Sequence, residues 1–571
     1  MSAFTQQSPK TPELVRDMLL AAAGAFGDKP AILAGGKDGY RAYPYRRLRS
    51  DIEALGTELM ACGLEGKKLL ILGDNGYGWV LSVLTALCGS GIAVPLDKTL
   101  SAGEVAHLAD FTDAAAILYS DRLEAATSLL PDSVRRIPFS SFATLLEQGR
   151  GKINSGITDF IRLELDADAP ALFAFTSGTA FSPKAAMLSN ANLCYDIRQT
   201  LMLLCPDSTD SFLSVLPLHH VYELVCGLLL PLSVGASIAY GEGLGSLIRN
   251  MNEVHPTTLV TVPVVVEALA AKVREAKRAE GNKKTEVGIV TTNFLPFPAA
   301  YAVKKKLFAG IHKLFGGNLS HVVCGGSPVD EQALQTLCDV GILAVEGYGL
   351  CECSPVVAVN PIGSFRTGSV GVGLPDSTID IYNIQEDGTG EIRVKGKNVM
   401  LGYYKNPELT AEVIRGEWFY TGDLGCMDED GFLYITGRKK NVIVKAGGKN
   451  VFPEEIETWL NRSPFVRESV VVGFINNKKR DYDLVAVIRP DYEKIIEVYG
   501  ENYTASDVET EIETAVENVN AELPAYKQID MTILRREPFE RNRSRKIRRI
   551  GVAPSVIEEY RRKLAENEKN P

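Results

Sequence analysis

The 571-residue sequence has few features of a zinc protein or of a disulfide-stabilised domain. Its ten cysteines are scattered and form no C-x-x-C pair, and its six histidines show no H-x-x-x-H spacing. Structural zinc sites need closely spaced ligands and disulfide frameworks need dense cysteine, so both classes are disfavoured. Reduced thiols are typical of the cytoplasm, and we therefore expect a cytoplasmic protein.

Long apolar runs and an excess of positive charge are also missing. The longest uncharged run, residues 224–241, is broken by glycine, proline and serine, so we expect buried core elements rather than a membrane span. The N-terminal residues show no basic segment followed by an apolar one, and we expect no secretory signal. The net charge of −10 disfavours nucleic-acid binding, because it would repel a phosphate backbone.

The sequence does contain the alternation of strands and helices that is typical of parallel sheets. Residues 67–74, 91–97 and 114–119 read as strands. A helical stretch over 79–88 separates the first two, and a capping box at Ser101–Glu104 begins a helix before the third. The same alternation continues along the chain, with further candidate strands at 171–175, 210–218, 257–263 and 319–324.

The pattern changes near Gly437. Two short antiparallel strands between glycine turns are predicted before it, and an alternating strand, a second strand and a charged helix are predicted after it. These elements are 390–396 and 431–437, then 468–475, 483–488 and a helix that begins near Ser506 with a capping pattern at Ser506–Glu509. We predict an α/β protein with a large N-terminal domain, 1–437, and a small α+β C-terminal domain, 438–571. The large domain would combine parallel βαβ subdomains with a small β-rich subdomain.

Residues Thr176–Lys184, with the sequence T-S-G-T-A-F-S-P-K, follow a predicted buried strand. Gly178 would allow backbone N–H groups to approach a phosphate, the hydroxyls would donate hydrogen bonds, and Lys184 would supply charge. The segment matches neither the common P-loop nor the dinucleotide fingerprint. From these residues alone, a polar turn at a strand end is as good an interpretation.

Several other segments carry polar groups where an apolar pattern breaks. His220 and Glu223 follow a predicted strand, and so does the glycine pair before Ser327 and Pro328. The further segments are Glu346–Glu352, the glycine turn around Asp423 and the basic run Arg543–Arg548.

In this order and spacing, the segments resemble the motifs of the adenylate-forming (AMP-binding) superfamily, and most closely its fatty acyl-CoA ligase branch. The resemblance covers nearly the whole chain. Each motif is weak by itself, but five in sequence are hard to explain by chance. The positions that match are Thr176 to Thr179, Pro183, Lys184, Pro217, Leu218, His220, Glu223, Gly325 to Pro328, Gly347 to Gly349, Glu352, Tyr420 to Asp423, Gly437, Arg438 and Lys440.

The resemblance implies a site for ATP and Mg²⁺. The loop would hold the β- and γ-phosphates, Tyr348 would stack on adenine, and Asp423 with Arg438 would accept the ribose hydroxyls. Glu352 would hold the metal. The implied nucleotide-binding residues are Thr176, Ser177, Gly178, Thr179, Lys184, Gly326, Ser327, Pro328, Tyr348, Gly349, Asp423 and Arg438.

The resemblance also implies the chemistry. The carboxylate of a medium- or long-chain fatty acid would attack the α-phosphate of ATP, and the thiol of coenzyme A would then displace AMP. Lys546 would be the catalytic cation that bridges the carboxylate and the α-phosphate, and His220 would border the carboxylate end of the acyl channel. From its position alone, His220 could instead cap a buried strand end.

A domain swing is implied as well. The small C-terminal domain would be mobile and would rotate about Lys440 after adenylation. This rotation would bring a loop that contains Lys445, Gly447 and Gly448 to the site, where its glycines would let the pantetheine arm pass.

Two other functions remain open from the sequence. An acyl carrier protein could replace coenzyme A as the acceptor, because the C-terminal arginines could meet an acidic partner, although a solvated face explains them too. A nonenzymatic nucleotide or acyl binder would fit the departures at Ala180, Phe181 and Cys351. A peripheral membrane contact without a transmembrane segment, the acyl chain length and the oligomeric state are not decided by the sequence.

Cys351 stands where the family has threonine before the metal-binding glutamate, so a weak S–H donor replaces a hydroxyl. We predict that Cys351→Thr leaves the ligase activity intact or raises it, measured as the rate of acyl-adenylate formation. A severe loss of activity would show that the thiol has a role of its own.

Overall fold

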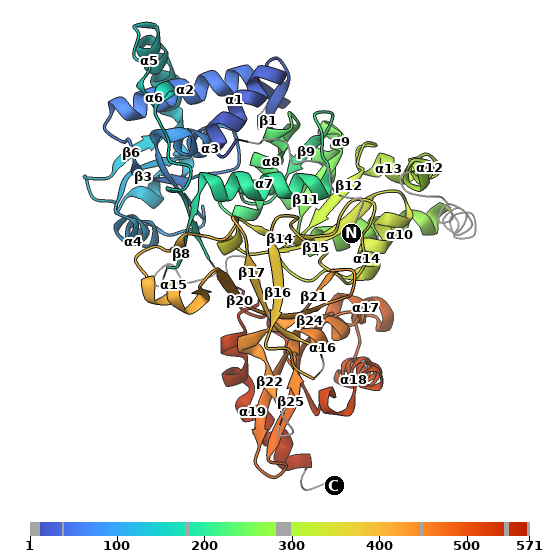
Figure 1. Cartoon of the computed structure of the whole chain (residues 1–571). Helices are drawn as coiled ribbons and strands as arrows, with labels where there is room; N and C mark the ends of the chain where they lie inside the picture. The colour runs from blue at the N-terminus through green and yellow to red at the C-terminus, as the bar shows by residue number, and fades with distance from the viewer. Residues whose placement is uncertain are drawn as a thin grey trace. The chain divides into compact units, whose positions relative to one another are not determined.

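The computed structural model describes residues 12–36, 39–176, 183–280, 299–386, 388–445, 449–541 and 547–567 (Figure 1). The chain divides into two compact units. The large unit comprises residues 1–380, 393–420 and 428–433, and the small unit comprises 381–392, 421–427 and 434–571. The predicted α/β class, with a large N-terminal part and a smaller C-terminal one, is confirmed.

The first large sheet of the large unit has seven strands in the order β18-β8-β7-β4-β3-β5-β6. The strands from β7 to β6 are parallel, and β8 and β18 are antiparallel at one edge. Their bounds are β3 Lys67–Leu72, β4 Gly91–Leu96, β5 Ala114–Tyr119, β6 Arg135–Pro138, β7 Pro170–Phe175, β8 Ala185–Ser189 and β18 Gly402–Tyr403. The strands predicted at 67–74, 91–97, 114–119 and 171–175 are therefore confirmed.

The second large sheet has nine strands in the order β15-β14-β13-β12-β11-β9-β10-β1-β2. Six neighbouring strands, from β13 to β1, are parallel. The bounds are β1 Pro30–Gly36, β2 Gly39–Pro44, β9 Ser211–Ser214, β10 Ser237–Tyr240, β11 Thr258–Thr261, β12 His321–Cys324, β13 Leu343–Gly349, β14 Val356–Val359 and β15 Val372–Gly373.

Two predicted strands are shorter than expected. The apolar run 210–218 forms a strand only to Ser214, and the run 257–263 ends as a strand at Thr261. Prolines explain both ends. Pro217 has no N–H to donate to a ladder, and Pro263 is the first residue of a helix, where its fixed φ is favourable.

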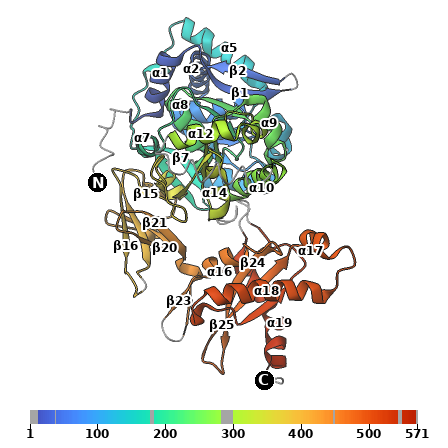
Figure 2. The same cartoon turned by 90° about the vertical axis from the view of Figure 1, so that its right-hand side faces the viewer.

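Helices cover these sheets. The capping box at Ser101 and Glu104 is present and begins α4 as predicted. Helices α1, α2 and α5 pack together at one end of the large unit (Figure 2). The bounds are α1 Val15–Phe26, α2 Tyr45–Ala61, α3 Tyr77–Thr85, α4 Ala102–Thr112, α5 Phe142–Asn154, α6 Asp159–Arg162, α7 Asn190–Leu204, α8 Leu230–Ser233, α9 Leu247–Val254, α10 Pro263–Glu280, α12 Ala299–Leu307, α13 Ala309–Leu314, α14 Glu331–Asp339 and α15 Pro407–Val413.

The uncharged run 224–241 is part of the core of the large unit. It forms most of a π-helical turn, Glu223–Leu229, then α8 and β10, and its leucines are buried. Among the described helices, none is both long and apolar enough to cross a membrane.

A five-stranded sheet has the order β16-β17-β20-β19, with β21 also paired to β20. Its strands are β16 Thr378–Tyr382, β17 Gly390–Lys395, β19 Ile414–Arg415, β20 Trp418–Met427 and β21 Leu433–Arg438. The strands predicted at 390–396 and 431–437 correspond to β17 and β21.

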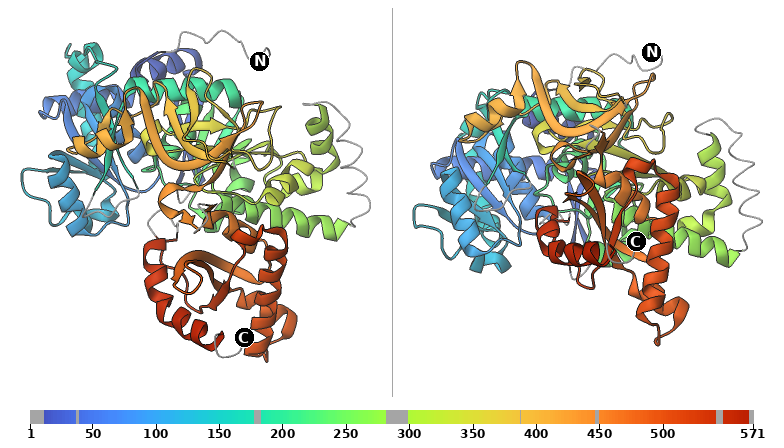
Figure 3. Two further views of the ribbon diagram at one scale, coloured as in Figure 1. Left: turned by 60° about the horizontal axis from the view of Figure 1, so that its bottom comes forward. Right: turned by 90° about the horizontal axis from the view of Figure 1, so that it is seen from below.

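The small unit is built around a three-stranded sheet whose two faces are both covered. On one face of β25, Leu484, Ala486 and Ile488 belong to an apolar cluster that includes residues of α16 and α18. On the other face, Val485 and Val487 belong to a cluster that includes residues of α19. Figures 1 and 3 show α18 and α19 on opposite sides of this sheet. The elements are β22 Ile443–Val444, β23 Asn450–Val451, α16 Pro453–Leu460, β24 Val466–Asn476, β25 Asp481–Pro490, α17 Tyr492–Tyr499, α18 Ala505–Glu522, β26 Met531–Leu534 and α19 Val552–Asn567.

The predicted capping pattern of α18 is wrong by two residues. The cap is Thr504, whose hydroxyl accepts the Asp507 N–H, while the Asp507 carboxylate accepts the Thr504 N–H. Ser506 lies inside the helix, where its carbonyl accepts a bond from Thr510. Both spacings fit a capping box, and the extended backbone of Thr504 decides between them.

We predict that Thr504→Ala destabilises the first turn of α18 by about 1 kcal/mol, because it removes a cap. Hydrogen exchange of peptides from α18, measured in the full chain, should become roughly fivefold faster. The control is Ser506→Ala, which should leave the exchange rate nearly unchanged. An equal or larger effect of Ser506→Ala would contradict this assignment of the cap.

Candidate functional site

Three of the predicted site segments follow parallel strands of the nine-stranded sheet. His220 follows β9, Gly326–Pro328 follow β12, and Tyr348 and Gly349 end β13. Because the carboxyl ends of parallel strands lie at one edge of a sheet, these residues share that edge. Ligands of open α/β sheets bind outside this edge, so it is the candidate site of the large unit.

The predicted phosphate loop connects β7 to β8, which form an antiparallel pair. The Thr176 N–H donates to the Lys184 carbonyl with an N···O distance of 3.0 Å, which closes the base of the loop. The Lys184 side chain is exposed. Ser177, Gly178 and Thr179 lie outside the described residues, so their part in phosphate binding stays a prediction.

The turn after β12 exposes its backbone. Gly325 is buried and donates its N–H to the Thr261 carbonyl at 3.1 Å, while Gly326, Ser327 and Pro328 are exposed. Gly326 has a φ of +92°, a conformation that side chains disfavour. This turn can therefore border a flat ligand with backbone atoms, as predicted for adenine.

Glu352 is held by a tyrosine that the motifs do not include. The Tyr403 hydroxyl donates to Glu352 Oε1 at 2.7 Å, and the Met400 N–H donates to the Glu352 carbonyl at 2.8 Å. Burial and the neighbouring carboxylate both raise the pKa of Tyr403, so its hydroxyl stays a donor. Tyr403 lies in β18, where it pairs with Ala186 of β8, so the carboxylate is tied to the strand that leaves the predicted phosphate loop.

Gly349 accommodates a close backbone approach at the end of β13. A Cβ atom there would lie 2.0 Å from the Pro355 carbonyl oxygen, so any side chain would clash. Tyr348 beside it is half-buried and Gly349 is exposed, so this strand end reaches the surface.

His220 lies in a turn between β9 and the π-helical turn. Its N–H donates to the Pro217 carbonyl at 3.1 Å, and its carbonyl accepts the Leu224 N–H at 2.9 Å. Its ring lies 4.2 Å from the ring of His219, whose Nε2 is 3.9 Å from Asp97 Oδ2. His220 is half-buried, which fits a residue at the mouth of a channel and also a cap of the strand end.

Glu223 is fully buried one turn further on. Burial raises its pKa to about 8 from an ordinary value of 4.5, and the opposing hydrogen bond from the Ser214 hydroxyl to Oε1 is too weak to prevent this. Oε2 has no hydrogen-bond partner in the part of the chain that the structure describes. The space occupied by the carboxyl group exists because position 227 is glycine: a Cβ there would lie 2.5 Å from the carboxyl carbon.

In the small unit, Asp423 and Arg438 are brought together from β20 and β21. Arg438 Nε lies 3.0 Å from Asp423 Oδ1, and the Asp423 N–H donates to the Thr421 hydroxyl at 3.0 Å. Asp423 is buried and Arg438 is partly exposed. A carboxylate fixed in this way suits a diol ligand, and the predicted ribose contact stays a prediction.

The other predicted residues of the small unit differ in what surrounds them. Lys440 is exposed in the short turn after β21. The Lys445 ammonium donates to the Tyr482 carbonyl and lies 3.7 Å from Asp530 Oδ2, so it supports the fold of its own unit. Gly447, Gly448 and Lys546 lie outside the described residues.

Most of the C-terminal arginines that the structure describes have partners within the small unit. Arg549 donates to both carboxylate oxygens of Glu457 at 2.7 Å, and Arg541 pairs with Glu468. Arg535 donates to two backbone carbonyls and lies over the Phe539 ring. These arginines therefore stabilise the unit itself, which weakens the argument that they form a free docking face.

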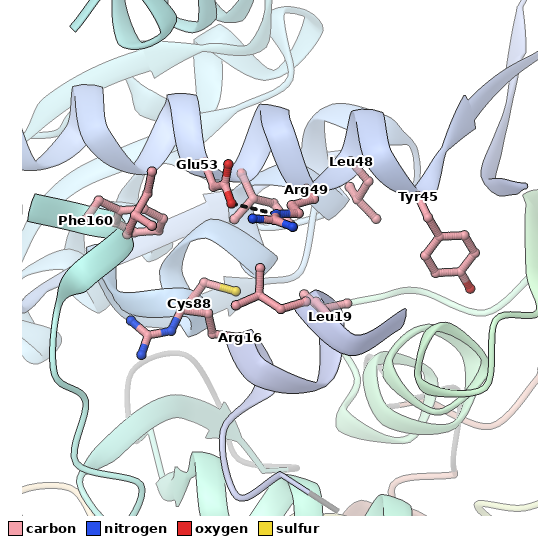
Figure 4. A pocket seen from close by; sticks show the side chains of 11 residues that line it. Arg16, Leu19, Tyr45, Leu48, Arg49, Glu53, Cys88 and Phe160 are labelled. Carbon is pink, nitrogen blue, oxygen red and sulfur yellow. Dashed lines mark hydrogen bonds and ion pairs between the residues drawn. The ribbon is translucent and has the colours of Figure 1, made fainter. Parts of the chain in front are cut away.

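A cavity of about 30 Å³ lies between α1 and α2 (Figure 4). Apolar side chains line most of it, with the Arg49–Glu53 ion pair at one side. It contains none of the predicted site residues, and its volume suits about one or two water molecules rather than an acyl chain. Its lining residues include Leu19, Tyr45, Leu48, Cys88 and Phe160.

Comparison with known proteins gives two family matches. Residues 19–404 match the AMP-binding enzyme family, and residues 440–563 match the AMP-binding enzyme C-terminal domain.

The similar curated proteins include two fatty-acid ligases. The long-chain-fatty-acid–CoA ligase FadD15 of Mycobacterium bovis is 28% identical over 457 residues, which cover 74% of each chain. Long-chain-fatty-acid–CoA ligase 1 of Cavia porcellus is 27% identical over 504 residues, which cover 80% of this chain and 70% of that protein.

Solved structures share the fold at low identity. A Mycobacterium tuberculosis fatty acyl CoA synthetase has a TM-score of 0.65 at 20% identity and covers 95% of this chain and 98% of its own. ATP-bound MatB from Rhodopseudomonas palustris has a TM-score of 0.73 at 20% identity, and the match covers 95% of this chain and 99% of the MatB chain.

The raised pKa of Glu223 predicts a pH dependence of stability. Because the folded chain holds this proton more tightly than the unfolded chain, the stability contribution of the protonated carboxyl is lost as the pH rises from about 4.5 to about 8. Glu223→Gln cannot ionise, so its melting temperature should rise relative to the wild type as the pH goes from 6 to 9. The control is Glu412→Gln, at an exposed position of α15. A melting-temperature difference for Glu223→Gln that stays constant across this range would contradict the burial argument.

Proposed function

Because this chain belongs to the AMP-binding enzyme family, we propose that it is an ATP-dependent ligase that activates a medium- or long-chain fatty acid and joins it to coenzyme A. The acyl-adenylate would be the intermediate. The fatty-acid specificity is supported by the names of the curated relatives and by the P-L-x-H-x-x-E pattern that ends at Glu223.

The observation that carries the proposal is the hydrogen bond from Tyr403 to Glu352. It joins the carboxylate proposed to hold Mg²⁺ to β18, and β18 pairs with β8, which begins directly after Lys184. A carboxylate tied to the outgoing strand of the proposed phosphate loop could share a Mg²⁺ with the phosphates, because Mg²⁺ is usually held by one or two carboxylates together with substrate phosphates.

In the first step, a carboxylate oxygen of the fatty acid attacks the α-phosphorus of ATP, and the bond to pyrophosphate breaks. Both reactants are anions, so their approach must be compensated by positive charge and by N–H donors. The loop 176–184 would orient the pyrophosphate that leaves, and Lys546 would neutralise the charge that develops between the carboxylate and the α-phosphate.

In the second step, the sulfur of coenzyme A attacks the acyl carbon and AMP leaves with the electron pair of the broken C–O bond. The thiol loses its proton to solvent. Attack by sulfur needs a path for the pantetheine arm, and the proposed path is the loop that contains Gly447 and Gly448. We propose that residues 438–571 move about Lys440 between the two steps, so that Lys546 and this loop serve the site in turn.

Mg²⁺ fits the oxygen donors present here. No group of three or more His, Cys, Asp or Glu side chains within the described ranges could hold a metal alone. Mg²⁺ bound to ATP usually needs only one or two carboxylates in addition to the phosphates, and Glu352 supplies one. When bound, the ion would neutralise phosphate charge.

A carrier protein as the acceptor is the second candidate, but the pairing of Arg541 and Arg549 with glutamates removes part of its support. An acceptor competition separates the two. Enzyme that is preloaded with acyl-adenylate should form the thioester of free coenzyme A. Rapid loading of a holo-carrier without a coenzyme A thioester would overturn our choice of acceptor.

We predict that Lys546→Ala lowers the rate of adenylation by at least about a hundredfold, the usual scale for one preorganised charge at a developing anion. Thioester formation from supplied acyl-adenylate should be spared. The control is Lys494→Ala, which removes a lysine paired with Glu497 on α17. An equal loss in both half-reactions of Lys546→Ala would contradict the proposed swing.

A further inference from the structure

In the loop after β3, the side chain of Asn75 binds the backbone just before His220. Its amide nitrogen donates to the Leu216 carbonyl at 2.6 Å, and its amide oxygen accepts the Leu218 N–H at 3.1 Å. One asparagine therefore binds the backbone on both sides of Pro217. The two bonds connect segments that are more than 140 residues apart in the sequence and belong to different sheets.

The loop that carries Asn75 is itself fixed in place. The Asp74 carboxylate pairs with Arg122 through two hydrogen bonds and with Lys98 at 2.8 Å, and the Asp74 N–H donates to the Ser120 hydroxyl at 3.1 Å. These partners come from segments that follow β4 and β5, the neighbours of β3 in the seven-stranded sheet. The loop that carries Asn75 is therefore held by hydrogen bonds and ion pairs to the segments after both neighbouring strands.

The bonds from Asn75 fall where the backbone has left its sheet. β9 ends at Ser214, and Pro217 has no N–H to contribute to a ladder. His220 follows in the same turn, because its N–H donates to the Pro217 carbonyl. Fixing Leu216 and Leu218 therefore fixes the turn from which His220 projects.

An asparagine side chain suits this position because it offers a donor and an acceptor together. Aspartate would keep the acceptor for the Leu218 N–H but would place a negative charge against the Leu216 carbonyl. Alanine would leave both backbone groups without this partner, and an unpaired buried polar group is costly.

We propose that Asn75 is a positioning residue for the acyl substrate: it holds the backbone turn of His220 against the seven-stranded sheet and so sets how the carboxylate end of the fatty acid is received. This inference rests on the proposed function for its effect on catalysis. The two side-chain hydrogen bonds of Asn75 go to Leu216 and Leu218 and to none of the predicted nucleotide-binding residues that the structure describes, so ATP binding should not depend on them.

The test is the kinetics of adenylation in Asn75→Ala and Asn75→Asp, with fatty acid and ATP varied separately. The loss of both bonds should lower kcat/KM for the fatty acid by roughly tenfold. The KM for ATP should change less than twofold. Asn75→Asp should be impaired in the same direction, which keeps the test usable if the alanine variant folds poorly.

The matched control is Asn520→Ala. Asn520 makes the same kind of contact in the small unit, where it donates to the Ile529 carbonyl at 3.0 Å and accepts the Ile529 N–H at 2.8 Å. The Asn520→Ala variant also loses two hydrogen bonds to backbone, but it should leave the ratio of the KM for the fatty acid to the KM for ATP unchanged. Equal changes in both KM values for the Asn75 variants, or the same pattern in Asn520→Ala, would overturn the proposal.

Hydrogen exchange of residues 215–222 separates this inference from the proposed function. The exchange should be faster in Asn75→Ala than in the wild type and unchanged in Asn520→Ala, whether or not the chain uses fatty acids. If the wild type has no activity on any fatty acid but the variants show this exchange pattern, the proposed function is refuted. The proposal that Asn75 holds the backbone around Pro217 then still stands. If the wild type is active but Asn75→Ala does not change the exchange of residues 215–222, the proposal that Asn75 holds this backbone is refuted.

Discussion

Parallel strands place their carboxyl ends at one edge of a sheet, and the large unit depends on this constraint. Side chains and exposed backbone that are remote in the sequence become neighbours there without any local signal. The turns after β9 and β12 supply a histidine and glycine backbone in this way, and the end of β13 supplies a tyrosine. Two long-range contacts then connect the sheets: Tyr403 with Glu352, and Asn75 with the turn before His220.

Polar groups are used differently in the two units. In the large unit, the backbone of the turn at Gly326–Pro328 is exposed at the surface. In the small unit, C-terminal arginines that could meet an acidic partner form internal ion pairs instead, as Arg549 does with Glu457. Burial raises the pKa of Glu457 to about 7 even though the ion pair with Arg549 lowers it, and a buried carboxylate of this kind needs such a partner.

The sequence predicts the fold well wherever the signal is local. The strands β3, β5 and β7 and the cap of α4 follow from apolar runs and from a serine and a glutamate three residues apart. The sequence is less informative where two local patterns compete, as at Thr504 and Ser506, or where a strand ends before its apolar run does, as near Pro217.

The site shows the same limit more strongly. Motif spacing identifies Glu352, but Tyr403 belongs to no motif, and its role depends on the pairing of β18 with β8 across more than 200 residues. The role of Asn75 could not be predicted from the sequence either, since an asparagine after a strand is typical of an ordinary turn.

The central claim is that the purified chain joins a fatty acid to AMP. The most direct measurement is the incorporation of labelled pyrophosphate into ATP, with fatty acids of graded chain length and with Mg²⁺ present or removed. We predict exchange that requires both the fatty acid and Mg²⁺. Nucleotide binding without any fatty-acid-dependent exchange would contradict it and would favour a nonenzymatic binder.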